Sequence, residues 1–146
     1  MQLGMVGLGR MGANLVRRLM AAGHECVVTD LDRDAIAGLA AEGATGAEDL
    51  AGLAAALSPP RAVWVMVPAA VTGAVVEEVA AELEPGDVVI DGGNSSWRDD
   101  IARAATLADS GIDFVDVGTS GGVYGLERGF SLMIGGPDET VGRLAE

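Results

Sequence analysis

The sequence predicts an α/β fold in which helices cover both faces of a doubly wound, mostly parallel sheet. Short apolar segments alternate with helical segments along the whole chain, as a parallel sheet with right-handed crossovers requires. Residues 62–67 are apolar without interruption, as expected for a central strand that is buried on both faces. The 146 residues are enough for one domain with one core, which we place at residues 1–146.

The first strand–helix–strand unit is the clearest part of this pattern. A strand is predicted at 2–6, a helix at about 10–22 that ends at Gly23, and a second strand at 24–29. The second strand contains Cys26, the only cysteine, so the chain cannot form a disulfide framework.

The remaining segments continue the alternation. Further strands are predicted at 44–45, 62–67, 87–91, 112–117 and 130–134, and further helices at about 32–42, 47–57, 70–83, 96–110 and from 137 onward. Asp32 is a predicted N-cap, Ser96 with Asp99 resembles a capping box, and Asp100 looks like part of a solvated helix start. Residues 118–129 are predicted to form a long glycine-rich loop. Ligands bind beyond the carboxyl ends of the strands in such sheets, and the loops expected on that rim are 7–12, 30–33, 67–70, 91–96 and 117–123.

The glycine-rich turn after the first strand has the spacing of a dinucleotide-binding motif. Gly7, Gly9 and Gly12 form a G-x-G-x-x-G pattern between a strand and a helix. Gly7 allows a tight turn, Gly9 lets a pyrophosphate approach the backbone, and Gly12 lets the helix pack closely. Asp30 ends the next strand, 18 residues beyond Gly12, where a carboxylate accepts hydrogen bonds from the adenosine ribose. The alternative is a glycine-rich turn without a ligand, but the surrounding strand, helix and acid favour a Rossmann-type NAD(P)-binding domain.

Residue 30 also indicates which dinucleotide is bound. The Asp30 carboxylate would repel the 2′-phosphate of NADP, and Leu31 cannot bind it. Arg33 is the only nearby cation, and an aspartate stands on either side of it. The sequence therefore favours NAD over NADP as the cofactor.

The charge of the chain argues against several kinds of partner. The net charge is −13 and no basic run occurs, so nucleic acids and anionic membranes are poor partners. No apolar run approaches the roughly 20 residues of a membrane span, and the start lacks the basic segment of a secretory signal. We therefore expect a cytoplasmic protein, and we predict no metal site.

Three further rim segments carry groups suited to a ligand. Asn94 follows two glycines and offers a donor and an acceptor for a carboxamide or a substrate hydroxyl; the alternative is a turn whose Asn94 and Ser95 cap the next helix. Ser120 precedes two glycines, whose N–H groups could form an anion-binding nest, although a flexible hairpin loop is the alternative. Residues 67–69 lie either beside a cofactor or in a simple strand-to-helix turn.

Four segments together resemble the decarboxylating 6-phosphogluconate dehydrogenases of the β-hydroxyacid dehydrogenase superfamily, most of all their shorter bacterial, NAD-preferring branch. They are VGLGRMG at 6–12, DGGNS at 91–95, DVGTSGGV at 116–123 and FSLMIGG at 130–136. The resemblance implies oxidation of 6-phosphogluconate at C3 by hydride transfer, then loss of CO2 to give ribulose 5-phosphate. The substrate-binding residues that it implies are Asn94, Ser120, Gly121 and Gly122. With the glycine motif, it predicts cofactor binding by Gly7, Leu8, Gly9, Arg10, Met11, Gly12, Asp30, Leu31, Val67, Pro68, Ala69 and Asn94, although Met11 could instead face the core.

The chain departs from this family in two respects. The longer, NADP-using branch carries Asn-Arg where this chain has Asp30 and Leu31, which supports NAD. The family's catalytic lysine and glutamate lie in an all-helical domain that follows this one, whereas this chain contains no lysine and stops at residue 146. We therefore predict no catalytic residue here. The isolated chain should bind NADH but not turn over 6-phosphogluconate, because the base for the C3 hydroxyl is missing.

The absent helical domain would also provide the main surface through which the full-length enzyme forms a homo-oligomer. Two other interpretations remain. One is a sister enzyme, such as a 3-hydroxyisobutyrate-type dehydrogenase or an imine reductase. The other is a non-catalytic module that senses NAD(H), which the absent lysine favours and the substrate-facing Ser120 segment does not.

Overall fold

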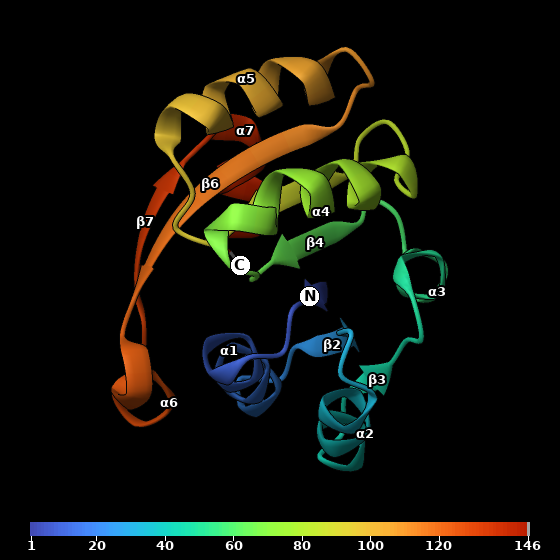
Figure 1. Cartoon of the computed structure of the whole chain (residues 1–146), viewed down its shortest axis with the longest axis vertical. Helices are drawn as coiled ribbons and strands as arrows, with labels where there is room; N and C mark the ends of the chain where they lie inside the picture. The colour runs from blue at the N-terminus through green and yellow to red at the C-terminus, as the bar shows by residue number, and fades with distance from the viewer. Residues whose placement is uncertain (146) are drawn as a thin grey trace.

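The structure, a computed structural model, describes residues 1–145, apart from the side chains of residues 97 and 123. A seven-stranded sheet lies at its centre in the order β3-β2-β1-β4-β5-β6-β7 (Figure 1). The strands are β1 (Gln2–Val6), β2 (Glu25–Thr29), β3 (Thr45–Gly46), β4 (Ala62–Val65), β5 (Val88–Asp91), β6 (Asp113–Ser120) and β7 (Ser131–Gly135). The helices are α1 (Arg10–Ala21), α2 (Arg33–Ala41), α3 (Leu50–Ala56), α4 (Ala69–Ala81), α5 (Trp97–Ala108), α6 (Gly125–Arg128) and α7 (Asp138–Leu144), with a 3-10 turn, η1 (Gly122–Tyr124). This arrangement confirms the predicted doubly wound α/β class.

The carboxyl ends of the parallel strands are aligned along one edge of the sheet. Val6 of β1 pairs with Thr29 of β2 and with Val65 of β4. Val65 pairs in turn with Asp91 of β5, and Asp91 pairs with Asp116 of β6. The loops that leave these strands therefore start from one rim, where ligands bind in doubly wound sheets.

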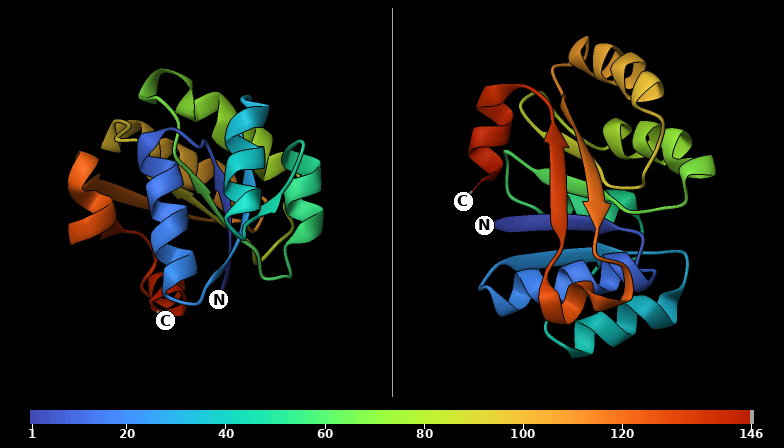
Figure 2. Two further views of the ribbon diagram at one scale, coloured as in Figure 1. Left: turned by 90° about the horizontal axis from the view of Figure 1, so that it is seen from below. Right: turned by 90° about the vertical axis from the view of Figure 1, so that its left-hand side faces the viewer.

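Helices cover the sheet on both faces (Figure 2), and the sheet separates two apolar clusters. Helices α1, α2 and α7 pack on one face, where Met5 and Val16 are fully buried. Helices α3, α4 and α5 pack on the other face, where Val63 and Val89 are fully buried. The removal of these apolar side chains from water is the main force that holds the layers together. Within the described residues, no helix combines the length and the apolar character that crossing a membrane requires.

The region after the sixth predicted strand differs from the expectation. β6 runs to Ser120, and residues 118–120 pair antiparallel with residues 131–133 of β7. The predicted loop at 118–129 is therefore wrong, because its first residues extend a strand and η1 and α6 occupy residues 122–128. The partner strand provides the hydrogen bonds that keep this glycine-containing segment extended, and such pairing is not visible in the local sequence.

Two helix starts also differ. Ser96 is the N-cap residue of α5, but its side chain makes no capping hydrogen bond, so the predicted capping box is wrong. Helix α3 begins at Leu50 rather than at 47, because the Asp49 side chain accepts a hydrogen bond from the first turn at 2.7 Å. The predicted N-cap Asp32 is confirmed, since its side chain accepts a hydrogen bond from Asp34 N–H at 2.9 Å.

Candidate functional site

The three glycines of the motif have different surroundings. Gly7 has a φ of +96°, and a Cβ there would lie 2.3 Å from the carbonyl oxygen of Met66. A Cβ at Gly12 would lie 2.1 Å from the carbonyl oxygen of Gly7, whereas a Cβ at Gly9 would meet no atom within 4 Å. Gly7 and Gly12 thus allow the close packing of the turn, and Gly9 leaves its backbone open to an approaching group.

The open turn leads directly into α1, a helix of 12 residues. Gly9 is its N-cap and makes no side-chain capping bond, and its first turn contains no acidic residue. The first N–H groups and the positive end of the helix dipole are therefore not neutralised by the helix itself. Such an N-terminus can bind a phosphate group.

The carboxylate of Asp30 joins the second strand to the glycine turn. One oxygen accepts a hydrogen bond from Leu8 N–H, and the other accepts one from Asp32 N–H at 2.8 Å. The Leu8 side chain is buried in the core, so only its backbone faces this turn, and Leu31 is fully exposed beside it. Each carboxylate oxygen keeps a further lone pair, which a ribose hydroxyl could use.

A cleft of about 720 Å³ brings several of the predicted cofactor-binding residues together. They come from the loops after β1, β2 and β4, and they are Gly7, Gly9, Asp30, Leu31, Val67 and Pro68. The rest of the lining consists of Val6, Thr29, Glu48, Asp49, Leu50, Met66, Val71, Val75 and Glu78. The apolar part of this lining suits a planar base, and the glycine side suits phosphates.

Other predicted cofactor-binding residues lie outside the lining of the cleft. In the first turn of α1, Gly12 is buried and Arg10 is exposed. Met11 is half-buried in that same turn, and Ala69 is exposed at the start of α4. The cleft therefore contains the predicted cofactor-binding residues near positions 7, 30 and 67. Arg10, Met11, Gly12 and Ala69 are not part of its lining.

Carboxylates dominate the charge of the cleft. Glu48, Asp49 and Glu78 join the carboxylate of Asp30, and no cation lines the cleft within the described part of the chain. Arg33 Nη1 lies 3.8 Å from Glu48 Oε1, so this guanidinium already has an anionic partner. A 2′-phosphate would add negative charge to this cluster. The sequence analysis missed Glu48, although its place just after the third parallel strand is the signal that could have found it.

The turn after β5 holds Asn94 in a left-handed conformation on the rim. Its φ is +56°, and no other non-glycine residue of those described has a positive φ. A Cβ at Gly92 would lie 2.1 Å from Trp64 Nε1, and a Cβ at Gly93 would lie 2.7 Å from the carbonyl oxygen of Val67. The turn is therefore packed tightly underneath, while Asn94 itself is exposed.

The N-cap of α5 is Ser96 and not Ser95. The alternative in which Ser95 helps to cap this helix is therefore wrong. The Ser95 hydroxyl donates a hydrogen bond to Asp91 Oδ2, and Asp91 Oδ1 accepts another from Gly93 N–H at 2.8 Å. Asp100, expected at a solvated helix start, is only 4% exposed and faces the same hydroxyl. Burial, together with the negative charge of Asp91, raises the pKa of Asp100 above its ordinary value. Buried carboxylates behind the turn therefore hold it.

Ser120 ends β6 and is exposed. Gly121 and Gly122 follow with φ values of +154° and +48°, and a Cβ at Gly122 would meet no atom within 4 Å. A 3-10 turn continues the chain, so the segment differs from the flexible hairpin loop of the alternative. Because β5 and β6 are parallel neighbours, the structure places all four predicted substrate-binding residues at or beyond the carboxyl ends of adjacent strands.

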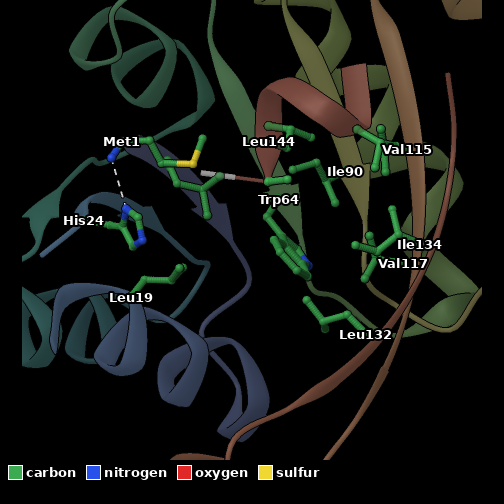
Figure 3. A pocket seen from close by; sticks show the side chains of 13 residues that line it. Met1, Leu19, His24, Trp64, Ile90, Val115, Val117, Leu132, Ile134 and Leu144 are labelled. Atoms are coloured by element: carbon green, nitrogen blue, oxygen red, sulfur yellow. Dashed lines mark hydrogen bonds between the residues drawn. The ribbon is translucent and has the colours of Figure 1, made fainter. Parts of the chain in front are cut away.

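A second cavity, of about 200 Å³, lies between α1, α7 and the sheet (Figure 3). Its lining consists of Met1, Leu3, Leu19, His24, Trp64, Ile90, Val115, Val117, Leu132, Ile134, Val141, Leu144 and Ala145. Among the described residues of this lining, His24 has the only ionisable side chain, and His24 Nδ1 lies 3.0 Å from the Met1 amino group. No predicted site residue lines this cavity, so we do not include it in the candidate site.

Comparisons with known proteins identify similar sequences and a similar fold. The family model described as the NAD binding domain of 6-phosphogluconate dehydrogenase matches residues 2–146. The NAD(+)-dependent, decarboxylating 6-phosphogluconate dehydrogenase of Haloferax volcanii is 44% identical over 138 residues, which cover 94% of this chain and 45% of that protein. The decarboxylating 6-phosphogluconate dehydrogenase of Treponema pallidum is 40% identical over 140 residues, covering 92% and 29%. The structure of Mycobacterium tuberculosis 3-hydroxyisobutyrate dehydrogenase superposes with a TM-score of 0.88 at 28% identity, covering 99% and 49%. The chain thus spans less than half the length of each relative.

Proposed function

Because this chain belongs to the 6-phosphogluconate dehydrogenase family, whose NAD-binding domain it matches over residues 2–146, we propose that it binds NAD(H) in the cleft beside the glycine turn. The observation that carries this proposal is that one cleft joins Gly9, Asp30 and Val67 from neighbouring strands. In the proposed complex the pyrophosphate lies against the open backbone of Gly9 and the N-terminus of α1. The adenosine ribose then lies beside the Asp30 carboxylate.

We further propose that the cofactor is NAD rather than NADP. The cleft carries carboxylates from Asp30, Glu48 and Glu78, and the guanidinium of Arg33 is paired with Glu48. A 2′-phosphate would be repelled there. The Haloferax relative is also described as NAD(+)-dependent.

On the substrate side, we propose that the longer protein takes 6-phosphogluconate or a similar sugar acid. The contacts would come from Asn94, Ser120, Gly121 and Gly122 on the rim. Bound NAD+ supplies the hydride acceptor, and the Asn94 amide can donate to one oxygen and accept from a hydroxyl. The chain contains no lysine, so a base for the C3 hydroxyl proton must come from elsewhere in the longer enzyme. The homo-oligomer of that enzyme would form through its helical domain.

Titration of the folded chain with NADH and with NADPH tests the cofactor proposal. We expect saturable NADH binding and, for NADPH, affinity at least about tenfold lower, since like-charge contacts of this kind cost more than about 1.4 kcal/mol. Asp30→Ala should reduce this difference between the NADH and NADPH affinities. Asp34→Ala also removes one carboxylate, but outside the cleft, and it should leave the difference between the two affinities unchanged. The absence of calorimetric heat with both coenzymes would overturn the proposal.

Three measurements separate this proposal from the alternatives. Purified chain mixed with NAD+ and 6-phosphogluconate should form no NADH, and measurable turnover would contradict the predicted inactivity. The reading frame after residue 146 distinguishes an enzyme from a sensing module. A continuing frame with a lysine-containing helical domain supports the enzyme, whereas a stop codon supports a module that only binds NAD(H). For the longer protein, preference for 3-hydroxyisobutyrate over 6-phosphogluconate would favour the sister enzyme.

A further inference from the structure

Asn94 has a conformation that the surrounding structure must maintain. Its φ of +56° is uncommon for any residue with a side chain, although asparagine tolerates it better than most. The Asp91 carboxylate tethers the residues on either side of it, because one oxygen accepts from Gly93 N–H at 2.8 Å and the other accepts from the Ser95 hydroxyl. Asp91 is 1% exposed, so this clamp works from beneath the turn.

Asp100 brings a second buried carboxylate to the same hydroxyl. Its two oxygens lie 3.0 and 3.3 Å from Ser95 Oγ. A hydroxyl has one proton to donate, so Ser95 can donate to Asp91 or to Asp100 but not to both at once. Two buried carboxylates this close repel each other unless a cation compensates them.

Arg103 is the cation that compensates them. Its Nη1 donates to Asp100 Oδ1 at 2.6 Å and lies 3.7 Å from Asp91 Oδ2. The Arg103 side chain is 19% exposed and that of Asp91 is fully buried, so water and salt screen the interaction only weakly. Asp116 on β6 adds to the negative charge, and burial, followed by the charges of Asp100 and Asp91, raises the pKa of Asp116.

Helix α4 leaves room for the Arg103 guanidinium. A Cβ at Gly73 would lie 3.1 Å from Arg103 Nη2 and 3.5 Å from Arg103 Nε. Gly73 lies in the interior of α4, where glycine is less favourable than alanine. The space needed by the guanidinium is a physical reason for a glycine at this position.

We propose that Arg103 and Asp100 are positioning residues for Asn94, because they hold the Asp91 carboxylate and the Ser95 hydroxyl that fix the turn. This inference rests on the proposed function, in which the Asn94 amide contacts the cofactor or the substrate. Arg103 and Asp100 act through Asp91 and Ser95 and touch no ligand themselves. Without either residue, the Asn94 side chain is therefore no longer held in one orientation.

The test compares Arg103→Met with Arg143→Met in the complete chain. Both variants lose one guanidinium, but Arg143 lies on α7, 3.8 Å from Asp113, and has no link to the turn. We expect Arg103→Met to shift and broaden the Asn94 side-chain amide resonances in an NMR spectrum. It should also weaken NADH binding about three- to tenfold, the change that corresponds to one lost hydrogen bond. Arg143→Met should leave both unchanged, and Arg103→Lys should restore part of both because it keeps the charge but not the planar donors.

Gly73→Ala tests whether the position of the Arg103 guanidinium matters, without a change of charge. It tests the positioning role even if Arg103→Met does not fold. The new methyl group displaces the guanidinium, so the Asn94 resonances should move in the same direction as in Arg103→Met but by less. If both variants leave these resonances where Arg143→Met leaves them, the positioning role is wrong. If the folded wild-type chain binds no NADH, the proposed function fails instead, and the Asn94 resonances still report on the positioning.

Discussion

Replacement of Gly9 with alanine separates cofactor binding from folding. Gly9 has a φ of −60° and a ψ of −178°, which alanine adopts freely, and a Cβ there would meet no atom within 4 Å. Alanine stabilises the fold by about 0.4–1 kcal/mol because it restricts the unfolded chain. It is a poorer N-cap than glycine by about 0.5–1 kcal/mol. These opposing effects should leave the free energy of unfolding within about 0.5 kcal/mol of wild type, or Tm within about 2 °C.

The effect of the same methyl group on binding should be large. It would occupy the space in which we place the pyrophosphate, and it would prevent at least one backbone N–H from reaching a phosphate oxygen. A hydrogen bond to a charged group contributes about 1.5–3 kcal/mol, so the Kd for NADH should rise about 10- to 100-fold. Fluorescence titration with NADH and thermal unfolding, measured on the same samples, give both quantities.

Two other glycines provide matched controls for this substitution. Gly38 lies inside α2, and a Cβ there would also meet no atom within 4 Å, so Gly38→Ala should stabilise the chain by about 0.5–1 kcal/mol without a change in NADH affinity. A Cβ at Gly12 would lie 2.1 Å from a backbone oxygen, so Gly12→Ala should lower both Tm and affinity. A Gly9→Ala chain that keeps wild-type Tm and wild-type NADH affinity would refute the placement of the pyrophosphate.

Further predictions concern ionisable groups away from the cleft. Burial raises the pKa of the Cys26 thiol from 9.0 to about 11, so the reactive thiolate is about 100-fold scarcer in the folded chain, and a thiol reagent at pH 8 should modify it at least that much more slowly than in urea. Burial raises the pKa of Asp87, but backbone N–H groups and the Arg61 guanidinium lower it overall. Asp87→Asn should therefore lower the free energy of unfolding by about 3 kcal/mol at pH 7, and this loss should shrink as the pH falls through the lowered pKa. Burial, reinforced by two neighbouring aspartates, raises the pKa of Asp116. The contribution of Asp116 to the free energy of unfolding is therefore lost as the pH rises from 3.8 through the raised pKa, and Asp116→Asn should be the more stable chain at pH 7. Urea unfolding at pH 3 and pH 7 measures both variants, and effects of the same sign at pH 7 would contradict this reasoning.

The sequence was most informative where one short segment determines the geometry. The glycine turn is such a segment, because the positive φ of Gly7 and the contact between Gly12 and the Gly7 carbonyl involve residues only five positions apart. The extension of β6 to Ser120 could not be predicted in this way, since it depends on pairing with β7. Glu48 likewise reaches the cleft through the crossover that follows β3. Contacts between distant segments are decided by packing, which local propensity does not encode.

The surroundings of Asn94 also could not be predicted from the local sequence. The sequence identified the exposed amide and its two preceding glycines, but Asp100 looked like a solvated residue at a helix start. In the structure it is 4% exposed and pairs with Arg103 at 2.6 Å. An aspartate in the first turn of a helix stabilises the helix dipole whether it faces solvent or the interior. The direction it faces depends on where α5 packs, so the sequence pattern could not distinguish the two cases.

Asp30 has two roles that a substitution affects together. Its carboxylate accepts hydrogen bonds from Leu8 N–H and Asp32 N–H, so Asp30→Ala releases the glycine turn as well as removing a ribose acceptor. Release of the turn should weaken NADH and NADPH equally, because both carry the same pyrophosphate, whereas repulsion of the 2′-phosphate acts on NADPH alone. The ratio of the two affinities therefore reports what residue 30 does at the 2′ position of the ribose, which is the hydrogen bond lost by NADH together with the repulsion relieved for NADPH. Either affinity alone also reports the release of the turn. If Asp30→Ala leaves this ratio unchanged, the discrimination against NADPH comes instead from Glu48 and Glu78, which also line the cleft.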